Sequence, residues 1–424
     1  MEKKAASDKP LPQLEDYLSP FSKYFVRSEG RESLERYSTG LLTDIPRKNG
    51  ATIEANVPGT NYQRLQSLMT DIQWDDRGVN QENVGQMRDD VSLGEAVLIT
   101  DDTGIPKQGK HSVGVARQYC SELGKVANCQ VVVTLHYADP AASWPVNARL
   151  YLPAEWTDEP ERMKKAGVPE DIEFQTKPEI ALALLDEANE MGISHEAVVS
   201  DASYGGNDTY LSGLEERGEH YVNGVPCDFP VIVAEDPEAN VQRADAVMHG
   251  IPRRKWKTIR WREGTKGWLG KKFVAVRAYR TVDGEVKKLG WLIGERPGYQ
   301  QTGEWKYSFS NFPADALLAK LVDYVHRRWH IDRFYEDAKN ELGMGDYQGR
   351  KWIGFQRHMV IVMLTYRFLA WSEWKHRQST PRSRGRPRDP FSPRRDKRRL
   401  PMQEIHRQII DALWLMAVEY HLRK

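Results

Sequence analysis

The chain has 424 residues, which suffices for two or three domains with apolar cores of their own. Its three cysteines form no Cys-x-x-Cys pair, so we expect buried thiols in a reducing compartment and no structural zinc site. No apolar stretch is long enough to cross a bilayer, so we expect neither a signal peptide nor a membrane span. The net charge is only +1, but residues 253–272 carry +8 and residues 375–400 carry +9, which excludes a uniformly basic protein and indicates two segments able to bind phosphate backbones.

The first segment of the chain, residues 1–90, has the periodicity of helices. Apolar side chains recur at helical spacing over residues 34–41 and 62–72, and Pro46 and the pair Pro58-Gly59 interrupt the pattern. We therefore expect an N-terminal helical domain over residues 1–90.

The next segment, residues 91–223, changes to strand periodicity. Residues 96–100 and 129–135 are short apolar runs of the buried-strand type. A helix that begins at Pro178 follows, then a strand over residues 197–200, a helix over about 207–217 and a strand at Tyr221 and Val222. Strands that alternate with helices in this way predict an α/β fold.

Residues 224–312 form a different, strand-rich and basic segment. Residues 273–280 alternate, Asp283-Gly284 is a turn signal, and residues 289–293 form a return strand, which together predict a β-hairpin. Five of the 13 tryptophans lie between residues 253 and 305. We expect a β-rich insertion domain here.

The last part of the chain is predicted to be helical, with one break. Residues 313–374 complete the core with packed helices, and residues 401–424 form a final amphipathic helix. Residues 375–400 are rich in proline and arginine, which predicts a disordered linker. In this linker Arg384 and Arg386 belong to an Arg-Gly-Arg-Pro core that is typical of AT-hooks, and Arg388 follows it. Such arginines enter the minor groove of A·T-rich DNA; sequence-independent phosphate contact and a solvated linker are the alternatives.

Acidic residues follow two of the predicted strands. Asp101 and Asp102 follow the first strand, and Asp201 follows the fourth. With a third carboxylate on a later helix, this order is that of an RNase H-like fold, in which the carboxylates hold two divalent cations for phosphoryl transfer. Since neighbouring residues of a strand point to opposite faces, only one of Asp101 and Asp102 is expected to reach the cations; we favour Asp101 and leave the choice open.

Five ordered stretches carry a family resemblance: residues 101–107 (DDTGIPK), 113–120 (VGVARQYC), 127–130 (ANCQ), 150–153 (LYLP) and 338–343 (AKNELG). They resemble DDE transposases of bacterial insertion sequences, in the group with a strand-rich insertion before the last acidic residue. The likeness runs from about residue 30 to residue 372. It implies Mg²⁺-dependent cleavage of double-stranded DNA at the inverted repeats of an element, with Mn²⁺ as a substitute ion, and strand transfer of the freed 3′-hydroxyl into target DNA by a cut-and-paste route. It also implies a homodimer that bridges two ends.

The resemblance also indicates the third carboxylate. The group has a Tyr, Arg, Glu, Lys signature, with spacings of three, four and seven, in its last catalytic helix. Arg328, Asp332 and Lys339 keep the second and third spacings with Asp in place of Glu, while Tyr324 is one residue out of frame. Glu336 lies one turn further on the same helix face, so it is the alternative to Asp332, which we favour. Arg328 and Lys339 are expected to contact DNA phosphates, or, for Lys339, to form an ion pair with Glu336.

The tryptophans of the inserted segment have two explanations. An aromatic face among cations can hold an unstacked base beside its phosphate, and in some relatives a tryptophan of the inserted domain receives a flipped base during hairpin formation. Trp291 is our candidate for that role. Packing in the core of a small sheet explains these tryptophans equally well.

The leading function is therefore a DNA transposase in which Asp101, Asp201 and Asp332 hold Mg²⁺. A catalytically inactive DNA-binding relic or regulator of such an element is the alternative, supported by Asp in place of Glu at position 332. A structure-specific nuclease without strand transfer is a third possibility, which the N-terminal helices and the basic insertion disfavour. We expect a cytoplasmic, nucleoid-associated protein.

Overall fold

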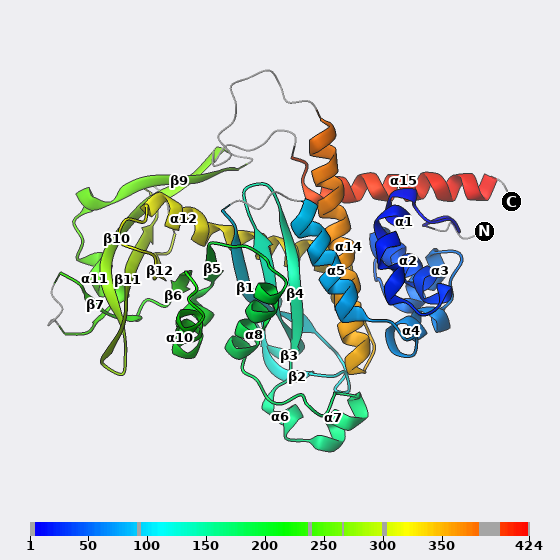
Figure 1. Ribbon diagram of the computed structural model, residues 1–424, viewed down its shortest axis with the longest axis horizontal. Coiled ribbons are helices and arrows are strands. Elements are labelled where there is room, and N and C mark those ends of the chain that lie inside the picture. Colours follow the sequence, from blue (N-terminus) through cyan, green and yellow to red (C-terminus); the bar gives the residue numbers. More distant parts are fainter. Residues whose placement is uncertain are drawn as a thin grey trace.

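The computed structural model describes residues 5–90, 95–235, 240–264, 267–298, 303–380 and 399–422, with side chains described to residue 419. The molecule is elongated (Figure 1): a β-rich part lies at one end, a helical part with both chain termini lies at the other, and a mixed sheet lies between them. No helix of these described ranges is both long and apolar enough to span a membrane.

The N-terminal part is helical, as its periodicity predicts. Its helices pack on one another and on the long helix α14 (Trp352–Ser379), where the Tyr37 hydroxyl shares a hydrogen bond with His358 Nδ1 (3.0 Å). Asn49 and Asn61 cap two of these helices by accepting hydrogen bonds from backbone N–H groups of the first turn. The elements are α1 (Pro12–Leu18), η1 (Ser19–Tyr24), α2 (Ser28–Leu42), α3 (Gly50–Asn56), α4 (Tyr62–Thr70) and α5 (Asp76–Asp90).

A mixed five-stranded sheet forms the centre of the molecule and confirms the predicted α/β class. Its order is β2-β3-β1-β5, with β4 also paired to β3. β1 is antiparallel to β3 but parallel to β5, and that parallel pairing ends at Thr100 opposite Ser200. The strands are β1 (Val97–Pro106), β2 (Ala116–Cys120), β3 (Lys125–Ala138), β4 (Ser143–Tyr151) and β5 (Ala197–Ser200).

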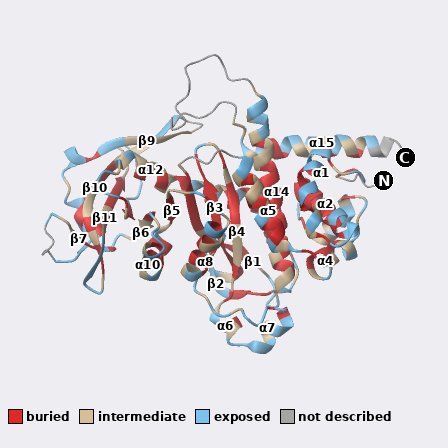
Figure 2. Cartoon of the chain, in the orientation of Figure 1, coloured by how far each residue is buried: buried red, intermediate tan, exposed pale blue. Residues whose placement is uncertain are grey.

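The two faces of this sheet belong to different cores, and buried residues run through its strands and through α14 (Figure 2). Val97 and Ile99 join the cluster formed with α13 (Trp329–Asn340) and α14, whereas Leu98 joins the cluster formed with α8 (Lys177–Glu190). A capping box of Thr176 and Glu179 starts α8, as the first-turn proline predicts.

A second sheet follows in the chain and lies at the β-rich end. Its order is β6-β12-β11-β10-β7-β8, with β9 paired to β10. The predicted hairpin is confirmed: Val282 pairs with Glu285 across Asp283 and Gly284, which both have positive φ, as this two-residue turn requires. The strands are β6 (Val222–Val225), β7 (Pro230–Val233), β8 (Gln242–Arg243), β9 (Lys257–Gly264), β10 (Gly267–Val282), β11 (Glu285–Arg296) and β12 (Lys306–Ser310).

The remaining elements connect these layers. α12 precedes α13 and packs on β9, β5 and β6, and α15 contacts α14 and α2. Their bounds are α6 (Ala154–Thr157), α7 (Pro160–Ala166), α9 (Ala202–Gly205), α10 (Asp208–Glu216), α11 (Ala244–His249), η2 (Arg253–Lys255), α12 (Leu318–Arg327) and α15 (Met402–Leu422).

Three sequence-based expectations are wrong in detail. β1 continues to Pro106, because the long β3 pairs with it throughout, so Asp101 and Asp102 lie inside the strand and not at its end. α14 continues to Ser379, so residues 375–379 are helical where a disordered linker was expected. Cys227 is exposed, unlike the buried Cys120 and Cys129. The AT-hook-like arginines Arg384, Arg386 and Arg388 lie outside the described residues.

Candidate active site

Asp101 and Asp102 face opposite sides of the central sheet, as strand alternation requires. Asp101 has the orientation of Val97 and Ile99, toward α13, and its Oδ2 accepts a hydrogen bond from Arg328 Nη1 at 3.0 Å. Asp102 has the orientation of Leu98, toward α8. Its Oδ2 is 2.9 Å from Lys177 Nζ, and its Oδ1 accepts from the Tyr204 hydroxyl at 3.2 Å.

Asp201 lies directly after β5, beside the point where the parallel pairing with β1 ends. Its Oδ1 caps the short helix α9, accepting from the backbone N–H groups of Ser203 and Tyr204 and from the Ser203 hydroxyl (2.6 Å). Its Oδ2 has no hydrogen-bond partner among the residues that the structure describes. One carboxylate oxygen of Asp201 is thus available to a ligand.

Asp201 is held in place by a close approach of α9 to β6. A Cβ added to Gly205 would lie 1.9 Å from the Gly224 carbonyl oxygen, and one added to Gly224 would lie 3.1 Å from the Ala202 nitrogen. Only residues without a side chain allow this distance. The strand β6 therefore fixes the helix that Asp201 begins.

Asp332 lies in the first turn of α13, on the same side of the sheet as Asp101. Arg328, which lies between α12 and α13, contacts both carboxylates: its Nη1 is 3.0 Å from Asp101 Oδ2, and its Nη2 is 3.1 Å from Asp332 Oδ2. One guanidinium thus joins Asp101 on the sheet to Asp332 on the helix. The predicted contact of Arg328 with a DNA phosphate stays a prediction.

Glu336 and Lys339 have other partners. Glu336 pairs with Arg333 Nη1 at 3.1 Å and is 55% exposed, whereas Arg333 also holds the buried Asp337. Lys339 donates to the Gly104 carbonyl at 2.8 Å and pairs with Glu122 at 2.8 Å. The alternative for Lys339, an ion pair with Glu336, is therefore wrong, because the side chain reaches back to β1 and the turn after β2. The predicted contact of Lys339 with a DNA phosphate stays a prediction.

The carboxylates of Asp101, Asp201 and Asp332 influence one another. Burial and the negative charge of Asp201 raise the pKa of Asp101 well above its usual value, against the opposing charge of Arg328. Burial also raises the pKa of Asp332, where Arg328 again opposes the shift and Asp201 adds to it. Although burial opposes it, the pKa of Arg328 is raised by Asp101 and Asp332. Burial and mutual repulsion thus disfavour simultaneous ionisation of Asp101 and Asp332, and Arg328 offsets part of this effect.

Three residues of this region were not among those predicted from the sequence. Tyr204 and Lys177 hold Asp102, and Tyr335 on α13 contacts Thr134 on β3, the strand partner of Asp101. Tyr204 lies three residues after Asp201, so nearness in sequence was a usable signal for it, whereas Lys177 is 75 residues from Asp102 and depends on how α8 packs. The contact of Tyr335 depends on how α13 packs.

The tryptophans near the site are mostly engaged in packing. The Trp291 indole N–H donates to the Pro313 carbonyl at 2.9 Å, and the ring lies beside Arg277, so the structure gives no direct support to its proposed role as a base acceptor.

Two residues of β9 contact the junction of α12 and α13. Trp261 stacks on His326 (ring centroids 3.8 Å apart), and Arg262 lies 3.9 Å from the ring centroid of Trp329.

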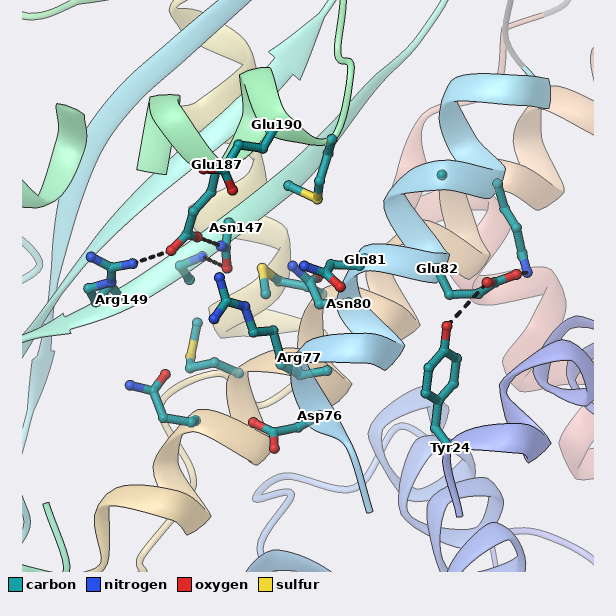
Figure 3. Close-up of a pocket in the computed structure, with 18 of the residues that line it drawn as sticks. Tyr24, Asp76, Arg77, Asn80, Gln81, Glu82, Asn147, Arg149, Glu187 and Glu190 are labelled. Carbon is teal, nitrogen blue, oxygen red and sulfur yellow. Dashed lines mark hydrogen bonds and ion pairs between the residues drawn. The ribbon is translucent and has the colours of Figure 1, made fainter. Parts of the chain in front are cut away.

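A pocket of about 990 Å³ lies elsewhere, among α5, β4, α8 and α14 (Figure 3). Asn147 and Arg149 of β4 both contact Glu187 of α8 there, and Arg77 of α5 points toward them. Among the described residues that line this pocket, none is Asp101, Asp201 or Asp332. The cavity is therefore separate from the candidate catalytic carboxylates.

Comparison with known sequences identifies the family. A sequence model for DDE superfamily endonucleases matches residues 20–268, more than half of the chain. The chain belongs to the DDE superfamily of endonucleases. The match confirms the resemblance that the motifs indicate. It includes Asp101 and Asp201 but ends before Asp332.

One curated relative is the probable transposase for insertion sequence element IS701 of Microchaete diplosiphon. The two sequences are 23% identical over 339 residues, which cover 79% of this chain and 81% of the relative. The similarity therefore extends over most of both chains and is not confined to a single motif.

Endonucleases of this superfamily generally use divalent cations. In the described part of the chain, no three His, Cys, Asp or Glu side chains are already arranged around one point as a metal site. Instead, the Arg328 guanidinium occupies the position between Asp101 and Asp332. The donor chemistry nevertheless fits a hard cation, since all three side chains offer carboxylate oxygens.

Proposed function

We propose that this protein is the transposase of an insertion sequence, which cleaves double-stranded DNA at the ends of its element and joins the freed 3′-hydroxyl to target DNA by a cut-and-paste route. The observation that carries the proposal is the approach of Asp101 and Asp332 to a single guanidinium, with Asp201 at the end of the neighbouring parallel strand. The similarity to a probable transposase over most of the chain supports it.

The strand order supports an RNase H-like catalytic core. In the sheet, four strands lie side by side in the order β4-β3-β1-β5. Beyond β5, a parallel bridge joins Val198 of β5 to Tyr221, the residue before β6. Asp101 on β1, Asp201 directly after β5 and Asp332 on the later helix α13 match the arrangement that the chemistry needs. In this interpretation, the β-rich residues 224–312 are an insertion between core parts 91–223 and 313–374, after a helical domain over 1–90 that reads the element ends.

We assign Asp101, Asp201 and Asp332 as the catalytic carboxylates that would hold two Mg²⁺ ions. When bound, such ions activate the attacking oxygen and stabilise the leaving oxygen in phosphoryl transfer. Asp201 offers its Oδ2, and the cap on Oδ1 fixes its orientation. Lys339 positions α13 against β1 through the Gly104 carbonyl. In this proposal, the partners are inverted repeats, target DNA and a second copy of the chain, in the cytoplasm at the nucleoid.

The test is cleavage of labelled DNA that carries the inverted repeats flanking the gene. With Mg²⁺, we expect cuts at the repeat boundary and, with target DNA added, joined products; EDTA or Asp201→Asn is expected to abolish both. Cuts without joined products would indicate a structure-specific nuclease. Specific DNA binding without cleavage in Mg²⁺ or Mn²⁺ would contradict the enzymatic proposal and leave an inactive DNA-binding relic.

A further inference from the structure

The position of Arg328 at the carboxylates has a consequence for cation binding. Its side chain is 31% exposed, while those of Asp101 and Asp332 are 13% and 46% exposed. The guanidinium is close enough to hydrogen-bond both carboxylates. It therefore uses carboxylate oxygens of the very residues that would bind divalent cations.

The two interactions compete because the Arg328 guanidinium lies 3.0 and 3.1 Å from carboxylate oxygens of Asp101 and Asp332, where its positive charge repels a divalent cation. Asp101 Oδ1 accepts from the backbone N–H of Asp102 at 2.7 Å, and Oδ2 is the oxygen that Arg328 contacts. A divalent cation on Oδ2 of Asp101 would lie close to this guanidinium, and the repulsion between the two positive charges favours release of Arg328.

We propose that Arg328 is a resident counter-cation of this site: it holds Asp101 and Asp332 together in the DNA-free protein and must leave them before divalent cations bind. This inference rests on the proposed function, since it assumes that the three aspartates form a metal site. It makes Arg328 a positioning residue, and it makes the apparent cation affinity depend on how often Arg328 is released.

DNA supplies a reason for the release. The planar guanidinium fork binds phosphate oxygens as well as carboxylates, so a phosphate near the site offers Arg328 an alternative partner. The strand β9 contacts the residues that flank Arg328 in the chain: Trp261 stacks on His326, and Arg262 lies over Trp329. This strand belongs to a basic segment. DNA that lies on β9 therefore brings phosphates toward this arginine. Cation loading is then coupled to DNA binding.

The experiment measures Mn²⁺ binding to the metal-stripped, full-length protein by isothermal titration calorimetry, without DNA. If Arg328 is released in about one-tenth of the molecules, Arg328→Gln binds Mn²⁺ about 10-fold more tightly than the wild type. Adding Asp101→Asn to Arg328→Gln is expected to remove this gain. Equal or weaker Mn²⁺ binding by Arg328→Gln would overturn the inference.

Arg333→Gln is the matched control. Arg333 lies one turn further along the chain, is 25% exposed, and bridges two acidic residues, Glu336 and Asp337, at similar distances. We expect it to bind Mn²⁺ as the wild type does. Arg328→Lys, which keeps the charge but loses the fork, provides a second variant if Arg328→Gln does not fold, and its expected affinity lies between the wild type and Arg328→Gln.

A second titration includes a short DNA duplex without the terminal repeats. We expect this DNA to tighten Mn²⁺ binding by the wild type and to change little for Arg328→Gln. Equal effects of DNA on the two proteins would contradict the coupling. The result is independent of cleavage: tighter Mn²⁺ binding by Arg328→Gln in a protein that never cuts DNA would support the inference and contradict the proposed function.

Discussion

At the residue scale, the two adjacent aspartates differ in the face of the sheet toward which each side chain points. The sequence predicts that Asp101 and Asp102 point apart, since this follows from strand geometry alone. It does not reveal which of them faces α13, because that depends on how a helix more than 200 residues later packs on the sheet. In the structure Asp101 shares Arg328 with Asp332, and Asp102 pairs with Lys177.

This difference predicts opposite consequences for two equivalent substitutions. We expect Asp101→Asn to reduce single-turnover DNA cleavage at least about 100-fold, because it removes a charge from the proposed cation site. Asp102→Asn is expected to retain cleavage and to lose about 1 kcal/mol of stability, through its weakened ion pair with Lys177. Cleavage by Asp101→Asn but not by Asp102→Asn would exchange the two assignments.

The third carboxylate shows a limit of sequence patterns. Asp332 and Glu336 lie one turn apart on one helix face, so spacing alone leaves both possible. Their partners differ: Asp332 contacts Arg328, which also contacts Asp101, whereas Glu336 contacts Arg333. The distinction depends on contacts of α13 with a distant strand, which the helix pattern does not contain.

At the scale of elements, the junction of α9 and β6 fixes the position of Asp201. Gly205→Ala places a methyl group against the Gly224 carbonyl, at a distance of 1.9 Å before any movement. We expect α9 to shift, with a loss of about 1–3 kcal/mol of stability and a marked loss of DNA cleavage. Thermal unfolding and single-turnover cleavage measure the two effects.

Gly85→Ala is the control for this substitution. Gly85 lies inside α5, and a Cβ there meets nothing within 4 Å in the described structure. The change is expected to leave cleavage intact and to stabilise the helix by up to about 1 kcal/mol. Equal activity of the two variants would contradict the claim that the close approach positions Asp201.

The turn that follows α13 is held by lysines from both sides. Lys48 donates to the carbonyls of Leu41, Thr43 and Glu341, and so joins the end of α2 to the end of α13. Lys107, just after β1, donates to the carbonyls of Gly345 and Tyr347. The helix that carries Asp332 is therefore anchored to both the N-terminal helices and the central sheet.

Burial of Lys48 predicts that stability depends on pH. Burial lowers its pKa to about 8, below the ordinary value of 10.5. Between these values the unfolded chain binds more protons than the folded chain, so this residue adds stability as the pH rises, by about 2 kcal/mol from about pH 7.5 to 9.5. We expect thermal unfolding of Lys48→Met to show a smaller rise over this range than the wild type. An equal rise in both proteins would contradict the assignment.

At the scale of the whole molecule, local signals predicted the elements better than their assembly. The Asp283-Gly284 hairpin and the helix after Pro178 were predictable because turn and cap residues specify them locally. The pairing of β6 with β12 joins segments about 85 residues apart, and no local pattern specifies it. For the same reason, the contacts of β9 with the α12–α13 junction were not predictable.

The basic segment predicts how DNA binding depends on salt. Arg254, Lys257 and Arg260 are exposed near the start of β9, at the end of the second sheet opposite the β10–β11 turn. We expect the triple Gln variant to bind DNA more weakly and to reduce the slope of log K against log salt by up to about 3, or about 1 for each lost phosphate contact. Fluorescence anisotropy over a salt series measures this slope.

The control removes charge from the opposite end of the same sheet. Lys287 and Lys288 are exposed beside the β10–β11 turn. Their double Gln variant is expected to keep the slope of the wild type. A similar loss in both variants would indicate general charge attraction and contradict a DNA path along β9.

The most direct test of the central claim, that Asp101, Asp201 and Asp332 act as one catalytic set on DNA, compares two variants of α13. It is single-turnover cleavage of labelled element-end DNA in Mg²⁺ by the wild type, Asp332→Asn and Glu336→Gln. We predict that the wild type and Glu336→Gln cut at the repeat boundary and that Asp332→Asn does not. Cleavage by Asp332→Asn together with its loss in Glu336→Gln would contradict the account.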